Sequence, residues 1–267
     1  MLTDPRPPMK YLIYEHPTPS IGVITLTDPT SRNAMGENMA SEFAALTAEI
    51  GSKADQPRVL IVTGAGGAFS SGGNLEMLDQ KRLLPPDENR RRMLSFYRSF
   101  LGIRSLGIPL IAAINGAAVG AGLCLACGCD IRIASTNAKL GLPFSRLGLY
   151  PGMGSTYLIS ALIGQQKATE LLLTGRIIGA SEALAIGLVS EVTEPDNVLL
   201  RAIAVATETA TAGPVTIKNL LPVLRNPPRS LDEALIAEAA AQAISYASDE
   251  FAEGVASARE KRPAVFR

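Results

Sequence analysis

Histidine, cysteine and tryptophan are scarce in this sequence. Its 267 residues include one histidine, three cysteines and no tryptophan. A Ser-His-Asp or Cys-His device would need His16, but this residue precedes Pro17 at the end of a predicted strand and no nucleophile motif accompanies it. We therefore interpret His16 as a turn residue, and we expect neither a zinc hydrolase nor any other metal site.

An excess of charge of one sign is also missing. Lys plus Arg and Asp plus Glu number 25 each, whereas a protein that follows a phosphate backbone normally carries a basic excess. No apolar run reaches the ~18 residues that span a bilayer, and the Pro-rich residues 1–8 lack the apolar segment of a secretory signal. We expect no nucleic-acid partner, no membrane partner and, by default, a cytoplasmic location.

The three cysteines lie within six residues, at Cys124, Cys127 and Cys129. Their C-x-x-C-x-C spacing invites a metal or redox interpretation. The stretch is apolar, however, and no second pair of ligands exists elsewhere in the sequence. We predict buried, reduced core cysteines in a reducing compartment.

Strand and helix patterns alternate over the first two thirds of the chain, which predicts an α/β fold with parallel strand pairing. With 47% hydrophobic residues, the chain has enough apolar side chains for a sizeable core. Asn38 is a suitable cap for the first predicted helix. The expected elements are a hairpin of residues 10–15 and 21–26, helices at 38–52, 87–106 and through Cys124, and strands at 59–63, 110–114 and 131–134.

Beyond residue 165 the pattern is helical, and the last three predicted helices are rich in alanine. Pro227 and Pro228 interrupt the chain before the helix that begins at Leu231. Such a tail is too thin to form a core of its own, so we expect it to pack on the core or on a neighbouring subunit of a homo-oligomer. The predicted helices are 167–173, 180–186, 198–212, 215–221, 231–248 and 250–262.

Two glycine-rich turns are the most informative elements. They run from Gly64 to Asn74 and from Asn115 to Gly122, and each follows a predicted strand and leads into a helix. A helix N-terminus offers free N–H groups and a positive dipole end, so two adjacent turns of this kind can aim two donors at one oxygen. A phosphate cradle and plain tight turns are the alternatives; no G-K-[ST] pattern occurs and the strict dinucleotide fingerprint is not met.

Several motifs occur in an order that points to one family. They include Arg-Asn-Ala-Met at 32–35, Ala-Phe-Ser-Ser-Gly-Gly-Asn-Leu at 68–75 and Cys-Asp-Ile-Arg-Ile-Ala at 129–134. Leu-Gly-Leu-Tyr-Pro-Gly at 147–152, Glu-Leu-Leu-Leu-Thr-Gly at 170–175 and the stretch 180–189 follow. Over about residues 10–195 the sequence resembles the crotonase (enoyl-CoA hydratase/isomerase) superfamily.

This resemblance implies a spiral of β-β-α units with a helical C-terminal trimerisation region. It divides the chain into an acyl-CoA-binding core, residues 1–200, and an oligomerisation region, residues 201–267. The expected assembly is a homotrimer or a dimer of trimers. The expected substrate is an acyl-CoA thioester, with no cofactor other than the coenzyme A that belongs to the substrate.

The resemblance also assigns site residues. By motif position, the backbone N–H groups of Gly73 and Ala121 form an oxyanion hole that stabilises the enolate of the thioester, and Ala121 stands where the family usually has glycine. Phe144 is expected in the wall of an apolar acyl pocket. Residues expected to contact the substrate are Ala34, Ala68, Ser71, Gly73, Leu75 and Phe144.

The sequence departs from the family where hydratases carry their acids and bases. One glutamate position, three residues beyond the second oxyanion residue, holds Cys124, and the other, after Gly-x-Pro, holds Phe144. A third family position for an acidic base holds Gly152. General acid–base groups contribute about 10²–10⁴-fold to a rate, so these replacements leave the identity of the acid and base open.

The substitutes that we consider are Cys124, Glu76 and Tyr150. Cys124 lies in the first turns of a helix, where the pKa of a thiol can fall, although packing is the alternative. Glu76 follows the first glycine turn, and its alternative is a solvated helix position. Tyr150 could donate a proton or simply line the acyl pocket. Asp79, Asp130, Ser145 and Arg146 are further polar candidates, and Asp130 has a structural alternative.

Three functions stay open at this point. The first is an acyl-CoA-transforming enzyme, a lyase or isomerase of the hydratase/isomerase type that uses non-standard residues or runs a related reaction such as decarboxylation, isomerisation or retro-aldol cleavage. The second is an acyl-CoA-binding homologue with little or no hydratase activity. The third is a role in assembly through the helical tail.

Overall fold

Six strands form the central sheet of the protein, which we describe from a computed structural model of residues 9–266. The order is β1-β2-β3-β5-β7-β10, and every neighbouring pair is parallel except β1 and β2. This arrangement confirms the predicted hairpin and the predicted parallel pairing. Residues 1–8, where we expected no secretory signal, lie outside the described residues. The strands are β1 (Leu12–Thr18), β2 (Ile21–Leu26), β3 (Val59–Gly64), β5 (Leu110–Ile114), β7 (Ile131–Ser135) and β10 (Glu191–Thr193).

A second sheet of four short strands lies beside the first, in the order β4-β6-β8-β9. Its strands are β4 (Ala68–Ser70), β6 (Ala117–Val119), β8 (Lys139–Gly141) and β9 (Ile177–Gly179). Each glycine-rich turn leads into a helix as expected, the first into α2 (Leu75–Lys81) and the second into α4 (Ala121–Gly128), but the short strands within the turns were not foreseen. Each turn first forms a short strand, β4 or β6, because the two segments pair with each other. The strand–strand–helix units that result confirm the predicted fold class.

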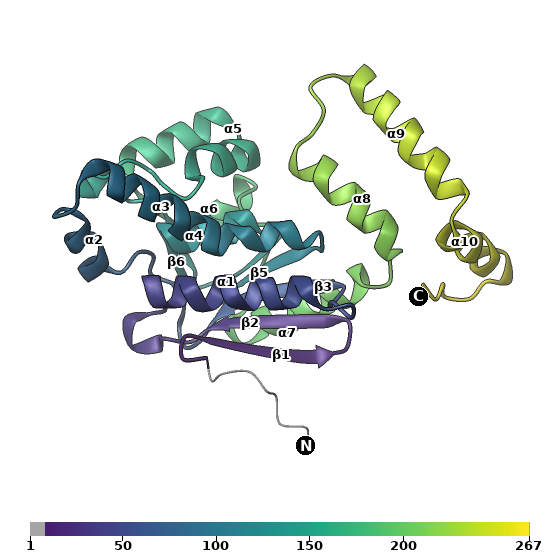
Figure 1. Ribbon diagram of the computed structural model, residues 1–267, viewed down its shortest axis with the longest axis horizontal. Helices are drawn as coiled ribbons and strands as arrows, with labels where there is room; N and C mark the ends of the chain where they lie inside the picture. The colour runs from purple at the N-terminus through teal and green to yellow at the C-terminus, as the bar shows by residue number, and fades with distance from the viewer. Residues whose placement is uncertain (1–8, 267) are drawn as a thin grey trace.

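Helices cover both faces of the central sheet (Figure 1). On one face lie α1 (Glu37–Ser52) and α3 (Pro86–Leu101), where the rings of Phe43 and Phe100 are 5.1 Å apart. On the other face lies α7 (Val198–Thr209), whose Ala202 and Ala206 are fully buried against β3 and β5. Side chains therefore alternate along β3, with Leu60 in one apolar cluster and its neighbour Ile61 in the other.

Two details of these helices differ from the sequence-based expectation. Asn38 does not cap α1, because the helix already begins at Glu37 and its N-cap residue is Gly36. The helix expected to end at residue 106 ends at Leu101, and the chain continues as a 3₁₀ turn, Gly102–Leu106. Four further helices complete the core. Three of them are short, namely α2 (Leu75–Lys81), α4 (Ala121–Gly128) and α6 (Ala180–Ala185), and the fourth is the long α5 (Ser155–Thr174).

The last three helices form an arm that extends away from the core (Figure 1). They are α8 (Pro214–Arg225), α9 (Leu231–Tyr246) and α10 (Asp249–Glu260). The Glu250 carboxylate of α10 accepts hydrogen bonds from the Val215 and Thr216 N–H groups at the start of α8. The expected boundary at residue 200 falls within α7, which packs on the sheet, so the arm begins only after that helix.

Arg225 attaches the arm to the core. Its guanidinium donates to both oxygens of the Asp130 carboxylate, at 2.8 and 2.7 Å. Asp130 also accepts the N–H of Leu110, the first residue of β5. These contacts give Asp130 a structural role and account for its position at the start of a strand.

No single described helix is long and apolar enough to cross a membrane. The segment Pro195–Thr209 and α8 reach that length and composition only as a pair, and the pair is bent by 113°. The first of these helices packs on the sheet.

Candidate active site

The two glycine-rich turns lie against each other. β4 pairs with β6 through Ala68 and Ala117, which aligns the residues that follow each strand. Gly72 has a φ of 97°, and a Cβ atom on it would lie 2.5 Å from the Val119 oxygen and 3.4 Å from the Ala121 nitrogen. The first turn thus packs on the N-terminus of α4 so closely that only glycine fits at position 72.

Gly73 and Ala121 carry backbone N–H groups that donate to no other group of the described residues. Ala121 is the first residue of α4, where an N–H has no partner inside the helix and the helix dipole is positive. Gly73 is held by a bridge to Met35, in which the neighbouring Gly72 oxygen and Asn74 N–H make the hydrogen bonds. Both N–H groups are therefore available to an external acceptor.

A network around Asn33 and Ser70, not predicted from the sequence, fixes the first turn. Asn33 is fully buried, and its Nδ2 donates to the Ala68 oxygen at 2.8 Å. The buried Ser70 hydroxyl donates to the Asn33 oxygen at 2.8 Å and accepts the Gly72 N–H at 3.2 Å. A Cβ atom on Gly122 would lie 2.7 Å from that of Ser70, so Ser70 touches both turns. The Arg-Asn-Ala-Met motif contains Asn33, but a buried polar role cannot be deduced from one sequence.

Most of the expected substrate contacts lie near the first turn. Ala34 and Ser71 are half-buried, and the Ser71 hydroxyl donates to the Ser31 oxygen at 3.0 Å. Leu75 is 72% exposed at the start of α2. Ala68 is different because it is buried in β4 and its oxygen already accepts from Asn33.

A cleft of about 390 Å³ opens beside this turn, between the first turns of α1 and α2. Ala34 and Glu76 both line it, so the structure brings an expected substrate contact and an acid/base candidate to one hollow. Glu76 is exposed, and Glu37 on the rim pairs with Lys81 at 2.6 Å. The residues that line the cleft are Tyr11, Asp28, Ala34, Gly36, Glu37, Asn38, Met39, Asn74, Glu76, Met77 and Gln80.

Cys124 lies one helical turn after Ala121 and is fully buried. Its thiol donates to the Gly152 oxygen, with the sulfur and oxygen 3.6 Å apart. Burial raises the pKa of this thiol well above its usual value, and the nearby Ser155 hydroxyl only tempers that rise. Cys124 is thus a packed core residue, the alternative given for it above, and burial raises the pKa of its thiol instead of the helix N-terminus lowering it.

The two aromatic candidates, Phe144 and Tyr150, lie apart from each other. Phe144 is half-buried, and its ring is 3.9 Å from the position that a Cβ on Gly120 would occupy, which puts it beside the second turn. Tyr150 is 82% exposed in the loop that follows, and its side chain meets solvent. Phe144 therefore lies beside Gly120, the residue before Ala121, whereas Tyr150 is on the surface.

Tyr97 is a further polar side chain in this region and was not among the candidates predicted from the sequence. It projects from α3, and a Cβ atom on Gly152 would lie 2.2 Å from its hydroxyl oxygen. Burial raises the pKa of Tyr97, and a hydrogen bond from the backbone of Met153 opposes this rise. A sequence gives no signal for this contact, because Tyr97 and Gly152 come from separate elements.

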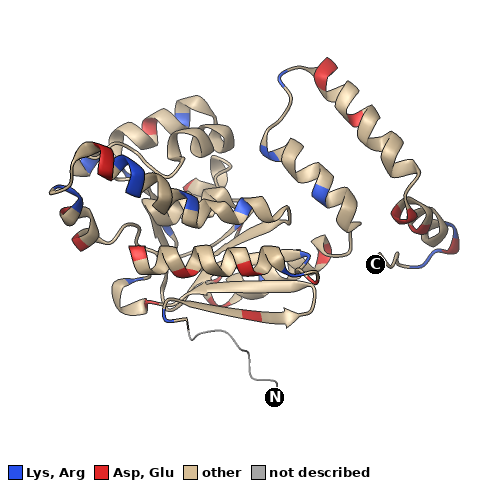
Figure 2. Cartoon of the chain, in the orientation of Figure 1, with Lys and Arg blue, Asp and Glu red and all other residues tan. Residues whose placement is uncertain are grey.

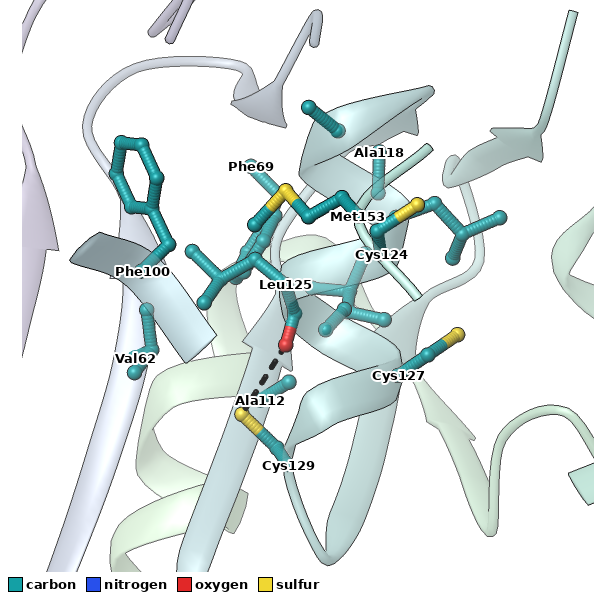
Figure 3. Close-up of a cluster of buried hydrophobic side chains, with 14 of the residues drawn as sticks. Val62, Phe69, Phe100, Ala112, Ala118, Cys124, Leu125, Cys127, Cys129 and Met153 are labelled. Carbon is teal, nitrogen blue, oxygen red and sulfur yellow. Dashed lines mark hydrogen bonds between the residues drawn. The ribbon is translucent and has the colours of Figure 1, made fainter. Parts of the chain in front are cut away.

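The three cysteines line the inside of the core, as predicted. All are buried and free, and Figure 3 shows their sulfur atoms pointing in different directions from α4 and its end. The Cys129 thiol donates to the Leu125 oxygen at 3.7 Å. Within the described part of the chain, no group of three or more His, Cys, Asp or Glu side chains could hold a metal ion.

Comparison with known proteins identifies the family of this chain. The family model for enoyl-CoA hydratase/isomerase matches residues 17–267. The chain belongs to this family.

Relatives match over nearly their whole length. A short-chain-enoyl-CoA hydratase from Clostridium acetobutylicum is 32% identical over 244 residues, which cover 91% of this chain and 92% of the relative. The solved structure of an enoyl-CoA hydratase from Bacillus anthracis has a TM-score of 0.89 at 30% identity and covers 96% of this chain and 99% of its own. An enoyl-CoA hydratase from Polaromonas has a TM-score of 0.89 at 26% identity, with coverage of 96% and 99%.

This member of the enoyl-CoA hydratase/isomerase family combines a regular backbone with unusual side chains. Its two turns present N–H groups at Gly73 and Ala121. The three positions at which the family resemblance leads one to expect carboxylates hold Cys124, Phe144 and Gly152. The acid and base must therefore come from elsewhere if the protein moves protons.

Proposed function

We propose that the protein is an acyl-CoA-transforming enzyme of the enoyl-CoA hydratase/isomerase type. In this proposal the N–H groups of Gly73 and Ala121 bind the thioester oxygen and stabilise the enolate that forms when negative charge moves onto it. The observation that carries the proposal is the pair of free N–H groups on two turns in van der Waals contact. Each such donor contributes about 2.7–4 kcal/mol where it has been measured.

The substrate in this proposal is an acyl-CoA thioester, whose coenzyme A runs along the first turn past Ala34, Ser71 and Leu75. No other cofactor is required for the enolate chemistry. The cleft at Ala34 has acidic groups on its rim, Asp28 and Glu76 among them. Because these carboxylates repel phosphate, the cleft suits an uncharged part of coenzyme A that offers hydrogen-bond donors, while the phosphates lie outside it.

A second candidate function is acyl-CoA binding with little hydratase turnover. The observation that favours it is the chemistry of Cys124 and Phe144, since a neutral buried thiol and a phenyl ring neither orient water nor accept a proton readily. Decarboxylation is a related possibility within the first proposal, because loss of carbon dioxide creates the enolate without a base.

We also infer that the arm mediates assembly into a homotrimer or a dimer of trimers. α9 has no buried residue, and Figure 2 shows that most of its length carries no charge. Leu231, Leu235, Ile236 and Ile244 are each more than half exposed. A partner subunit that covers these apolar side chains of α9 would remove the free-energy cost of exposing them to water. Sedimentation equilibrium measures the assembly directly, and a monomer would contradict this inference.

The test of the proposed function combines turnover and binding on the same protein. Loss of the conjugated thioester absorbance of crotonyl-CoA reports hydration, and calorimetry reports binding. Ala121→Pro removes one N–H at the first helical position, where proline is tolerated, and should lower kcat about 10²–10³-fold. Ala121→Ser keeps the N–H and is the matched control.

Each result has a definite meaning. Turnover that falls in Ala121→Pro and persists in Ala121→Ser supports the enolate proposal. Tight binding without turnover favours the second candidate. Absence of binding would overturn the acyl-CoA proposal itself.

A further inference from the structure

A hydroxyl group fills the space that glycine leaves at position 152. A Cβ atom on Gly152 would lie 2.2 Å from the Tyr97 oxygen and 2.9 Å from the ring carbon that bears it. These distances are far below van der Waals contact, so any larger residue at 152 would displace the phenol. Tyr97 and Gly152 thus share one site, and glycine makes room for the tyrosine.

Two contacts link this hydroxyl to α4, the helix whose first residue is Ala121. Cys124 is one turn along α4 from Ala121, and its thiol donates to the Gly152 oxygen at 3.6 Å. Tyr97 then packs directly on Gly152. The phenol therefore lies on the side of the second turn where the family resemblance leads one to expect an acid or base.

The neighbouring polar groups are less suited to carry a proton. The Cys124 thiol is fully buried and already donates to Gly152. Ser155 is 1% exposed, and its oxygen has no hydrogen-bond partner of regular geometry among the described residues. Tyr97 is half-buried, and its hydroxyl oxygen lies against Gly152.

We propose that the Tyr97 hydroxyl is the proton-carrying group of this site and occupies the place of a carboxylate at position 152. This inference rests on the proposed function. In hydration of an enoyl thioester, the water oxygen bonds to the β-carbon while the π electrons move toward the thioester oxygen, held by Gly73 and Ala121. The O–H bond of Tyr97 breaks as its proton bonds to the α-carbon, and the proton released by the water returns to the phenol oxygen. Atoms and charges balance, and Tyr97 ends as it began.

The protonation state of Tyr97 determines which reactions of the family it can serve. Burial raises the pKa of its phenol, so the group is a neutral acid near pH 7 rather than a base. It serves steps in which an enolate receives a proton. Isomerisations that begin with removal of an α-proton by a base should be much slower than hydration.

The experiment compares Tyr97→Phe with Tyr246→Phe, which removes a hydroxyl from the exposed arm. With crotonyl-CoA, Tyr97→Phe should lower kcat about 10²-fold or more and leave the calorimetric Kd for the thioester unchanged. Tyr246→Phe should keep the original kcat. An increase in KM with kcat unchanged in Tyr97→Phe would show that Tyr97 only shapes the pocket, and it would overturn the proposal.

Gly152→Ala provides the second variant. It keeps the tyrosine but pushes the hydroxyl out of its position, so kcat should fall as in Tyr97→Phe. This variant decides the question if Tyr97→Phe does not fold. An unchanged kcat in Gly152→Ala, or a loss in Tyr150→Phe without a loss in Tyr97→Phe, would overturn the proposal.

The failures of the two proposals are distinguishable. Turnover by the unaltered protein that survives Tyr97→Phe overturns the role of Tyr97 and leaves the enolate proposal intact. Binding without any turnover by the unaltered protein overturns Tyr97 as a proton carrier and favours the binding function. Absence of both binding and turnover overturns both.

Discussion

The backbone half and the side-chain half of this site differ in how much of the family pattern they keep. The backbone half, with the free N–H groups of Gly73 and Ala121, depends on turn geometry and tolerates alanine in place of glycine at 121. The side-chain half has Cys124, Phe144 and Gly152 where carboxylates are expected. A backbone donor survives most substitutions at its own position, whereas a carboxylate disappears with a single one. A single substitution therefore removes a side-chain group of this site more readily than a backbone one.

Returning a glutamate to the side-chain half gives the largest expected effect. Phe144 is half-buried beside the second turn, so Phe144→Glu places a carboxylate near the free N–H of Ala121. Hydration of crotonyl-CoA should increase about 10²-fold or more if the backbone half is intact. The measurement is kcat from the thioester absorbance.

Phe144→Gln is the matched control, because it has the same length and cannot take up a proton. An equal increase in both variants would mean that removal of the ring, rather than the new base, is responsible. No increase in Phe144→Glu would indicate that the backbone half does not stabilise an enolate.

Gly72→Ala should break the backbone half directly. Its Cβ would lie 2.5 Å from the Val119 oxygen, a backbone atom that cannot move aside, and the φ of 97° is unfavourable for alanine. The turn must shift and misplace the neighbouring Gly73 N–H, so kcat should fall about 10²-fold, comparable to loss of one donor. The melting temperature should fall as well.

Gly67→Ala is a suitable comparison, because nothing lies within 4 Å of a Cβ at that position and its φ is not in the left-handed region. Its kcat should equal that of the unaltered protein. Equal kcat in Gly72→Ala would contradict the close packing of the two turns as the source of their geometry.

A last expected effect, which appears only at alkaline pH and leaves kcat near pH 7 unchanged, concerns the apolar surroundings of α4. Burial raises the pKa of Cys127 from its usual 9.0 to about 11. Because the unfolded chain loses this proton at lower pH than the folded protein, the free energy of unfolding is unaffected below pH 9 and decreases as pH rises from 9 to 11. The rise in pKa corresponds to ~3 kcal/mol at the upper end of that window.

Urea denaturation at pH 7, 9 and 11 measures this effect. Cys129, with a pKa of about 12, contributes in the same direction, so Cys127→Ala should reduce the pH-dependent loss without abolishing it. A loss of equal size in Cys127→Ala and in the unaltered protein would show that the Cys127 thiol is not desolvated.

Much of the fold could be predicted from the sequence, because the strongest signals are local. The β-branched run at Val59 and the apolar run at Leu110 indicated buried strands, and the glycines after them indicated tight turns. The pairing of β4 with β6 could not be predicted, since each strand has three residues and forms only because the other lies beside it.

Less of the candidate site could be predicted. The motif resemblance assigns donor roles to Gly73 and Ala121, which stay predictions, and it does not indicate the neighbours of these residues in space. The pKa of Cys124 depends on the burial of α4, which a helix end alone does not indicate. The contact of Tyr97 with Gly152 joins two elements, and a missing side chain gives no sign of what fills its place.

The tight fit of Gly72 against Val119 has a consequence for how the proposed enolate chemistry responds to heat. The two N–H groups are held apart at a fixed spacing by the small sheet that contains β4 and β6, so their orientation is established during folding and not when substrate binds. In the proposed function, stabilisation of the enolate then depends on the local rigidity of these turns. A rise in temperature that loosens this sheet while the central sheet stays intact would slow the reaction before the protein melts.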